Sequence, residues 1–202
     1  MTSLGHASLP APRAGRGHKV QNMGDQSNHR IGFGNDVHRL APGCKLILGG
    51  VPIPFEKGPV GHSDGDALAH AVCDALLGAA ALGDIGHHFP DNDSQWHNVS
   101  SLLFLHRTRE LLDEAGYRIA NVDSTISLER PKLAPYILSM RKELAEALGI
   151  HVDQISVKAK TGEGVDAVGE GAAIRVDAVV LIEALGLKKS SGNPLGGEVR
   201  SA

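Results

Sequence analysis

An alanine- and leucine-rich run at residues 66–82 gives the clearest folding signal in the chain. Its apolar positions recur at helical spacing, and Gly83 follows the run as a suitable terminator. Ser63 or Asp64 is the predicted N-cap, since short polar side chains of this kind satisfy the first free N–H groups of a helix. We therefore predict a long helix at the centre of the fold.

Polar residues on this helix and on a predicted strand form the first candidate site. Asp66, His70 and Asp74 recur every four residues, so they share one helix face, and burying them is costly unless they are paired or bind a metal. Asp36 and His38 are two residues apart on a strand, which points both side chains to the same side. A carboxylate with two imidazoles suits zinc, and Asp66 or Asp74 is a possible outer partner that orients an imidazole. A core histidine bonded to a carboxylate explains the pattern equally well.

The remaining pattern alternates strands with helices. Strands are predicted at residues 30–38, 45–48, 51–53, 117–128, 155–159 and 172–183, and the second and third of these form a hairpin. Helices are predicted at residues 66–82, 100–115 and 134–148. This order indicates an α+β fold of the α/β sandwich type, in which a mixed sheet of about four strands is covered by about three helices.

The chain of 202 residues suits one domain. Residues 1–29 and 188–202 lack periodicity and are rich in polar residues, glycine and proline, so we predict a disordered tail on each side of a domain at residues 30–187. The first tail lacks the apolar segment of a secretory signal. Cys44 and Cys73 are too few for a disulfide scaffold. We therefore predict a cytoplasmic location, with plastid-type targeting by the first tail as the alternative.

Composition argues against two classes of partner. Aromatic residues make up 3% of the chain and the formal net charge is −3, which disfavours base stacking and a polyanion-binding surface, so no nucleic acid is expected. No apolar run reaches the roughly 18 residues that a membrane span requires. A small-molecule ligand is the remaining expectation.

Two polar loops carry residues suited to phosphates and cations. The first loop is residues 83–93, directly after the central helix. Its composition fits a ligand-binding loop, and it equally fits a solvated turn. Residues 160–164 read Lys-Thr-Gly-Glu-Gly after a strand. Backbone N–H groups in such a turn can cradle a phosphate, and Glu163 can bind a hard cation beside it. The spacing is not that of a P-loop.

Four runs, at residues 30–38, 62–70, 74–93 and 159–171, together resemble the family of 2-C-methyl-D-erythritol 2,4-cyclodiphosphate synthases. The HSDGD run and the LLGAAALGDIG run are the most specific. The resemblance implies an enzyme of the non-mevalonate isoprenoid precursor pathway. Such an enzyme converts 4-diphosphocytidyl-2-C-methyl-D-erythritol 2-phosphate to the cyclic diphosphate and releases CMP. It also implies a homotrimer with each active site between adjacent subunits.

The same resemblance assigns roles to individual residues. Zinc is expected at Asp36, His38 and His70, and magnesium or manganese at Glu163 together with substrate phosphates. Transition-state stabilisation falls to His62 and Thr161. The expected substrate contacts are Ser63, Asp84, Ile85, Gly86, Phe89, Pro90, Asp91, Asn92 and Asp93 for the erythritol side, and Leu128, Glu129, Arg130, Pro131, Lys132, Leu133, Ala134, Lys160 and Gly162 for the cytidine diphosphate side. The family often has an Ala-Thr-Thr-Thr-Glu run where this chain has residues 159–163, and we expect Lys160 to supply positive charge missing from this loop.

Two other functions remain open at the level of sequence. A metal-dependent phosphohydrolase would explain the three metal ligands and Glu163, but not residues 128–133. A trimeric, metal-stabilised binding protein would explain the metal ligands without any turnover.

Cyclisation needs no protein nucleophile, because the 2-phosphate of the substrate attacks the β-phosphorus and the protein has only to neutralise charge and fix geometry.

Overall fold

A mixed sheet forms the base of the fold in the computed structural model, which describes residues 28–61, 63–90, 93, 96 and 99–185. Its strands are β1 (His29–Pro42), β4 (Lys57–Pro59), β5 (Tyr117–Ser127), β6 (Ile155–Lys160) and β7 (Ala173–Ala184), in the order β4-β1-β7-β5-β6. Only the β5–β6 pair is parallel among these strands. A separate hairpin pairs β2 (Leu46–Leu48) with β3 (Val51–Ile53).

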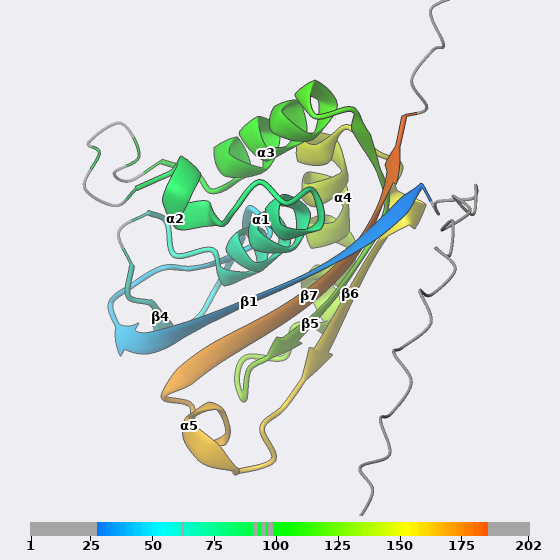
Figure 1. The fold of residues 1–202 in the computed structure, drawn as a ribbon. Helices are drawn as coiled ribbons and strands as arrows, with labels where there is room; N and C mark the ends of the chain where they lie inside the picture. Colours follow the sequence, from blue (N-terminus) through cyan, green and yellow to red (C-terminus); the bar gives the residue numbers. More distant parts are fainter. Residues whose placement is uncertain (1–27, 62, 91–92, 94–95, 97–98, 186–202) are drawn as a thin grey trace, which may run out of the picture.

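Three helices, α1 (Ala67–Ala79), α3 (Leu102–Glu114) and α4 (Ile137–Leu148), cover one face of the sheet (Figure 1). Shorter helices are α2 (Ile85–His88), α5 (Asp166–Gly169), and the 3₁₀ turns η2 (Ala134–Tyr136) and η3 (Val152–Gln154). No helix of the described residues is long and apolar enough to cross a membrane.

The central helix α1 packs directly on β1, and two glycines make this possible. A Cβ at Gly32 would lie 1.8 Å from the carbonyl oxygen of Ala75, and one at Gly34 would lie 2.2 Å from that of Ala71. Any larger residue at these two positions would push the helix away from the strand. The close approach brings the polar end of β1 beside the polar face of α1.

The other face of the sheet carries exposed apolar side chains. Ile31, Phe33 and Val37 of β1 are 73%, 60% and 57% exposed, and Val179 of β7 is 46% exposed. They alternate with inward-facing positions, as the period of a strand requires. Apolar groups gathered on one open sheet face are typical of an interaction surface.

The predicted α+β sandwich, a mixed sheet covered by three helices, is confirmed, and the sheet has five strands where about four were predicted. The three-residue strand β4 was not anticipated, because it is too short to show a period and, unlike β2 and β3, is not joined to its partner strand by a tight turn. The N-cap prediction was wrong: Asp66 caps α1 by accepting hydrogen bonds from the N–H groups of Leu68 and Ala69. β1 begins at His29, inside the predicted tail, while residues 1–27 and 186–202 lie outside the described part of the chain.

Candidate metal centre and active site

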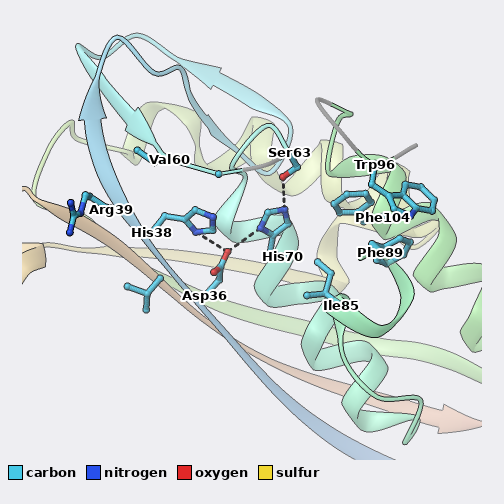
Figure 2. A pocket seen from close by; sticks show the side chains of 13 residues that line it. Asp36, His38, Arg39, Val60, Ser63, His70, Ile85, Phe89, Trp96 and Phe104 are labelled. Atoms are coloured by element: carbon cyan, nitrogen blue, oxygen red, sulfur yellow. Dashed lines mark hydrogen bonds and ion pairs between the residues drawn. The ribbon is translucent and has the colours of Figure 1, made fainter. Parts of the chain in front are cut away.

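Asp36 and His38 extend from β1, and His70 extends from the facing helix α1. One potential ligand atom of each residue lies within 4.8 Å of the others. Asp36 Oδ2 lies 3.1 Å from His38 Nδ1 and 3.1 Å from His70 Nδ1. Figure 2 shows both imidazole rings turned towards the Asp36 carboxylate. The strand and the helix therefore bring together the three predicted metal ligands.

The chemistry of this cluster fits a zinc-type cation. His38 Nδ1 is buried and makes no hydrogen bond of standard geometry with any described residue, although it lies 3.1 Å from Asp36 Oδ2. Burial acts to raise the pKa of the Asp36 carboxyl, but His38 and His70 outweigh it and lower that pKa to about 2. Burial acts to lower the pKa of His70, yet Asp36 raises it overall. An anionic carboxylate beside two imidazole nitrogens is a suitable ligand set for zinc.

The residues that orient His70 differ from those expected. His70 Nε2 lies 2.8 Å from Ser101 Oγ and 3.2 Å from Ser63 Oγ. Asp66 instead accepts hydrogen bonds from the N–H groups of Gly49 and Gly50, and Asp74 accepts one from Ile85 N. Asp66 is the N-cap of α1 and His70 and Asp74 lie within the helix, and both aspartates bind backbone N–H groups and not an imidazole. Ser101 was missed, because nothing in its local sequence indicates a contact with His70, which lies 31 residues away.

A cavity of about 440 Å³ opens onto the three ligands. Four of the predicted substrate contacts also line it, namely Ser63, Ile85, Gly86 and Phe89. Phe89 stacks on Phe104 with ring centroids 4.6 Å apart, and Trp96 packs edge-on against Phe89 at 5.1 Å (Figure 2). One side of the cavity is thus a rigid apolar wall.

The other predicted erythritol contacts within the described residues do not line this cavity. Asp84 instead caps α2 by accepting a hydrogen bond from His87 N. Pro90 and Asp93 lie farther along the same loop and do not line it either. His62, Asp91 and Asn92 lie outside the described residues.

The predicted cytidine diphosphate contacts gather elsewhere on the chain. Glu129, Arg130, Pro131 and Lys132 line a second cavity of about 390 Å³, together with Thr161, the predicted transition-state residue. The remaining members of this set are the buried Leu128 and Leu133, the half-buried Gly162, and the exposed Ala134 and Lys160. Among the described residues, none lines both this cavity and the one at the metal ligands.

Two loops are joined beside the second cavity. Leu128 N donates to the carbonyl oxygen of Lys160 over 2.9 Å, and Glu129 Oε2 accepts a hydrogen bond of 3.0 Å from Gly162 N. Thr161 Oγ1 donates to the carboxylate of Glu163, which is exposed. Glu163 therefore presents its carboxylate to solvent, apart from the Asp36 cluster.

Comparison with known proteins gives consistent matches. The model of the YgbB family matches residues 29–183. A curated 2-C-methyl-D-erythritol 2,4-cyclodiphosphate synthase of Gloeobacter violaceus is 58% identical over 154 residues, which cover 76% of this chain and 94% of that protein. The synthase of Solibacter usitatus is 57% identical over 157 residues, which cover 78% of this chain and 99% of that protein.

Solved structures show the same likeness. A 2C-methyl-D-erythritol-2,4-cyclodiphosphate synthase in its CDP-bound form aligns with a TM-score of 0.71 and 40% identity, over 76% of this chain and all of that chain. A CDP complex of IspF from Plasmodium falciparum aligns with a TM-score of 0.69 and 35% identity, over 79% of this chain and 99% of that chain.

Proposed function

The chain belongs to the YgbB family, the 2-C-methyl-D-erythritol 2,4-cyclodiphosphate synthases, and on this basis we propose how its residues divide the work of cyclisation. The enzyme converts 4-diphosphocytidyl-2-C-methyl-D-erythritol 2-phosphate to 2-C-methyl-D-erythritol 2,4-cyclodiphosphate and releases CMP, in the non-mevalonate pathway. The observation that carries our assignment is the convergence of Asp36, His38 and His70 at the wall of a cavity.

Asp36, His38 and His70 would hold a zinc-type cation at this wall. When bound, such a cation neutralises phosphate charge and polarises the phosphoryl group that is attacked. An oxygen of the 2-phosphate forms a bond to the β-phosphorus while the bond from that phosphorus to the oxygen bridging the α-phosphate breaks, and CMP leaves with that oxygen. Because the nucleophile belongs to the substrate, holding both phosphates in line is the main task of the protein.

The remaining residues of the first cavity would place the erythritol part of the substrate. Ser63, Ile85, Gly86 and Phe89 line it beside the metal ligands. We assign a role in erythritol binding also to Asp84, Pro90, Asp91, Asn92 and Asp93. The wall of Phe89, Trp96 and Phe104 would limit the access of water. Exclusion of water favours cyclisation over hydrolysis, because the attacking phosphate is already in place.

Residues 128–134 and 160–163 would hold the cytidine diphosphate part. Glu129 fixes the Gly162 backbone, and Lys160 offers a positive charge to the phosphates. We assign transition-state stabilisation to His62 and Thr161, and a magnesium or manganese site to Glu163 with substrate phosphates. The names of two solved relatives mention CDP, which supports a cytidine nucleotide subsite.

We propose that the chain is a homotrimer with active sites between subunits. The predicted residues form two groups that line separate cavities of one chain, so a partner subunit is needed to bring them onto one substrate. The bare sheet face with Ile31, Phe33, Val37 and Val179 offers the apolar surface that a subunit interface requires.

We also propose a cytoplasmic catalytic domain at residues 30–187 between tails at residues 1–29 and 188–202. Both cysteines, Cys44 and Cys73, are free thiols. Burial raises the pKa of the Cys73 thiol to about 12, so this thiol stays protonated and unreactive. Free thiols agree with a reducing compartment.

Glu163→Gln is expected to raise the magnesium concentration required for half-maximal rate by about 10-fold or more, because the neutral amide binds hard cations weakly. Zinc bound at the first site should stay at the wild-type level, since Glu163 lies outside the Asp36 cluster. The measurement is CMP release across a magnesium titration, with Glu170→Gln as an exposed control. An unchanged titration would remove Glu163 from the metal site.

Co-expression of two inactive variants tests the shared site. Chains with His70→Ala lack a zinc ligand, and chains with Glu163→Gln lack the protein ligand of the second metal, magnesium or manganese. A mixed trimer would contain a site whose two halves are both intact, so activity should return to a measurable fraction of wild type at a magnesium level where each variant alone is inactive. Mixed trimers, isolated with two different tags, that stay as inactive as their parents would place both halves within one chain.

A further inference from the structure

The buried side chain of Ser101, which is 0% exposed, lies between His70 and Asp64. Ser101 Oγ lies 2.8 Å from His70 Nε2 and 2.5 Å from Asp64 Oδ1. Ser101 N also donates to Asp64 Oδ2 over 2.9 Å. The three residues form a chain of hydrogen bonds that starts on the far side of the imidazole from Asp36.

The direction of each hydrogen bond follows from the donors available. A serine hydroxyl has one proton, and an ionised carboxylate only accepts hydrogen bonds. The Ser101 proton therefore goes to Asp64, and Ser101 Oγ is left to accept from His70. This arrangement requires a proton on His70 Nε2.

The tautomer of His70 matters because its other ring nitrogen faces the metal centre. His70 Nδ1 lies 3.1 Å from Asp36 Oδ2. In a neutral imidazole with its proton on Nε2, Nδ1 has a free lone pair, and a ring nitrogen needs this lone pair to bind a metal. Phe104 stacks on the ring with a centroid distance of 6.0 Å, which holds the plane of the imidazole.

We propose that Ser101, held by Asp64, is a positioning residue that keeps His70 in the tautomer whose Nδ1 binds the metal. The inference rests on the proposed role of His70 as a metal ligand. Ser63 is the weaker partner, since its hydroxyl lies 3.2 Å from His70 Nε2. Outer partners of this kind typically change metal affinity by about 10- to 100-fold.

A purely structural role as a helix cap does not explain the side chain of Ser101. It occupies the N-cap position of α3, but its hydroxyl makes no capping hydrogen bond to that helix. The start of the helix is held instead by Asp64, which accepts from the backbone N–H of Ser101, and by Ser100 Oγ, which accepts from that of Leu102. Removing the hydroxyl therefore leaves the capping interaction of α3 in place.

Ser101→Ala is expected to weaken zinc binding by about 10- to 100-fold. The affinity is measured by competition with a chromophoric chelator, and the absorption spectrum of the cobalt-substituted protein should change as His70 loses its fixed orientation. The matched control is Ser100→Ala, which removes the neighbouring, exposed hydroxyl and should keep both wild-type affinity and spectrum. Thermal unfolding of the metal-free proteins checks that the variants fold.

Asp64→Asn supplies a second, independent variant of nearly the same size. An amide can donate to Ser101 Oγ and release the serine proton towards His70, which would favour the tautomer protonated on Nδ1. We expect a loss of zinc affinity at least as large as in Ser101→Ala, and less than additive losses in the double variant. Nitrogen NMR of the zinc-loaded, histidine-labelled protein should find the His70 proton on Nε2.

Zinc affinities within twofold of wild type in both Ser101→Ala and Asp64→Asn would overturn the inference, as would a His70 proton on Nδ1. The proposed metal site fails in a different way. If His70→Ala keeps its zinc, the ligand assignment is wrong, whereas zinc loss in His70→Ala with unchanged Ser101→Ala refutes the positioning role alone.

Discussion

His70→Ala is expected to lose the tightly bound zinc and to cyclise its substrate more than about 100-fold slower than wild type. Loss of an outer partner already costs about 10- to 100-fold in metal affinity or activity, and loss of a ligand itself should cost more. His70 is one of the three ligands in the cluster, so its removal leaves only Asp36 and His38. Two ligands do not make a stable zinc site in water.

The measurement is the zinc content per subunit after dialysis, together with kcat/KM for CMP release. The matched control is His106→Ala on the exposed side of α3, which should keep wild-type zinc content and rate. A His70→Ala protein with full zinc stoichiometry would contradict the ligand assignment.

Asp66→Ala is expected to lower the free energy of unfolding by about 3–5 kcal/mol. Asp66 is 0% exposed and accepts hydrogen bonds from the N–H groups of Gly49 and Gly50, and from two N–H groups in the first turn of α1. Each buried N–H left unpaired costs about 1–3 kcal/mol, and loss of an N-cap costs about 1 kcal/mol. The substitution thus breaks the junction between the β2–β3 hairpin and α1.

Equilibrium unfolding by urea at one protein concentration gives this difference. Asp153→Ala is the matched control, because its side chain is 80% exposed and its ion pairs are worth little. Asp66→Asn keeps one acceptor oxygen and should fall between the control and Asp66→Ala. A loss below about 1 kcal/mol in Asp66→Ala would show that the hairpin and the helix find other partners.

The order of strands and helices was predictable because it depends on local periodicity. The long strands β1, β5 and β7 and the helices α1, α3 and α4 all lie where apolar residues recur with period 2 or 3.6. β4 was not predictable, since its three residues are a strand only through pairing with β1. The N-cap of α1 was assigned to the wrong residue because Ser63, Asp64 and Asp66 are all good capping residues, and the choice among them depends on the distant Gly49 and Gly50.

The metal ligands were predictable for a related reason. The i, i+2 spacing on β1 and the helical spacing on α1 each determine the side to which the polar side chains point. The cluster of Asp36, His38 and His70 is confirmed. Ser101 was not predictable, because nothing in its local sequence indicates that it meets His70. The family resemblance already divides the substrate contacts into two groups, but it does not show which members of each group line a cavity, since that depends on how the loops fold in space. Their individual roles stay predictions.

Product analysis by phosphorus NMR tests the central claim most directly. The protein is incubated with 4-diphosphocytidyl-2-C-methyl-D-erythritol 2-phosphate, zinc and magnesium, with His70→Ala as the inactive control. The expected products are CMP and 2-C-methyl-D-erythritol 2,4-cyclodiphosphate in equal amounts. Inorganic phosphate in their place would indicate a phosphohydrolase, and intact substrate beside a fully zinc-loaded protein would indicate a binding protein; either result would contradict cyclisation at this site.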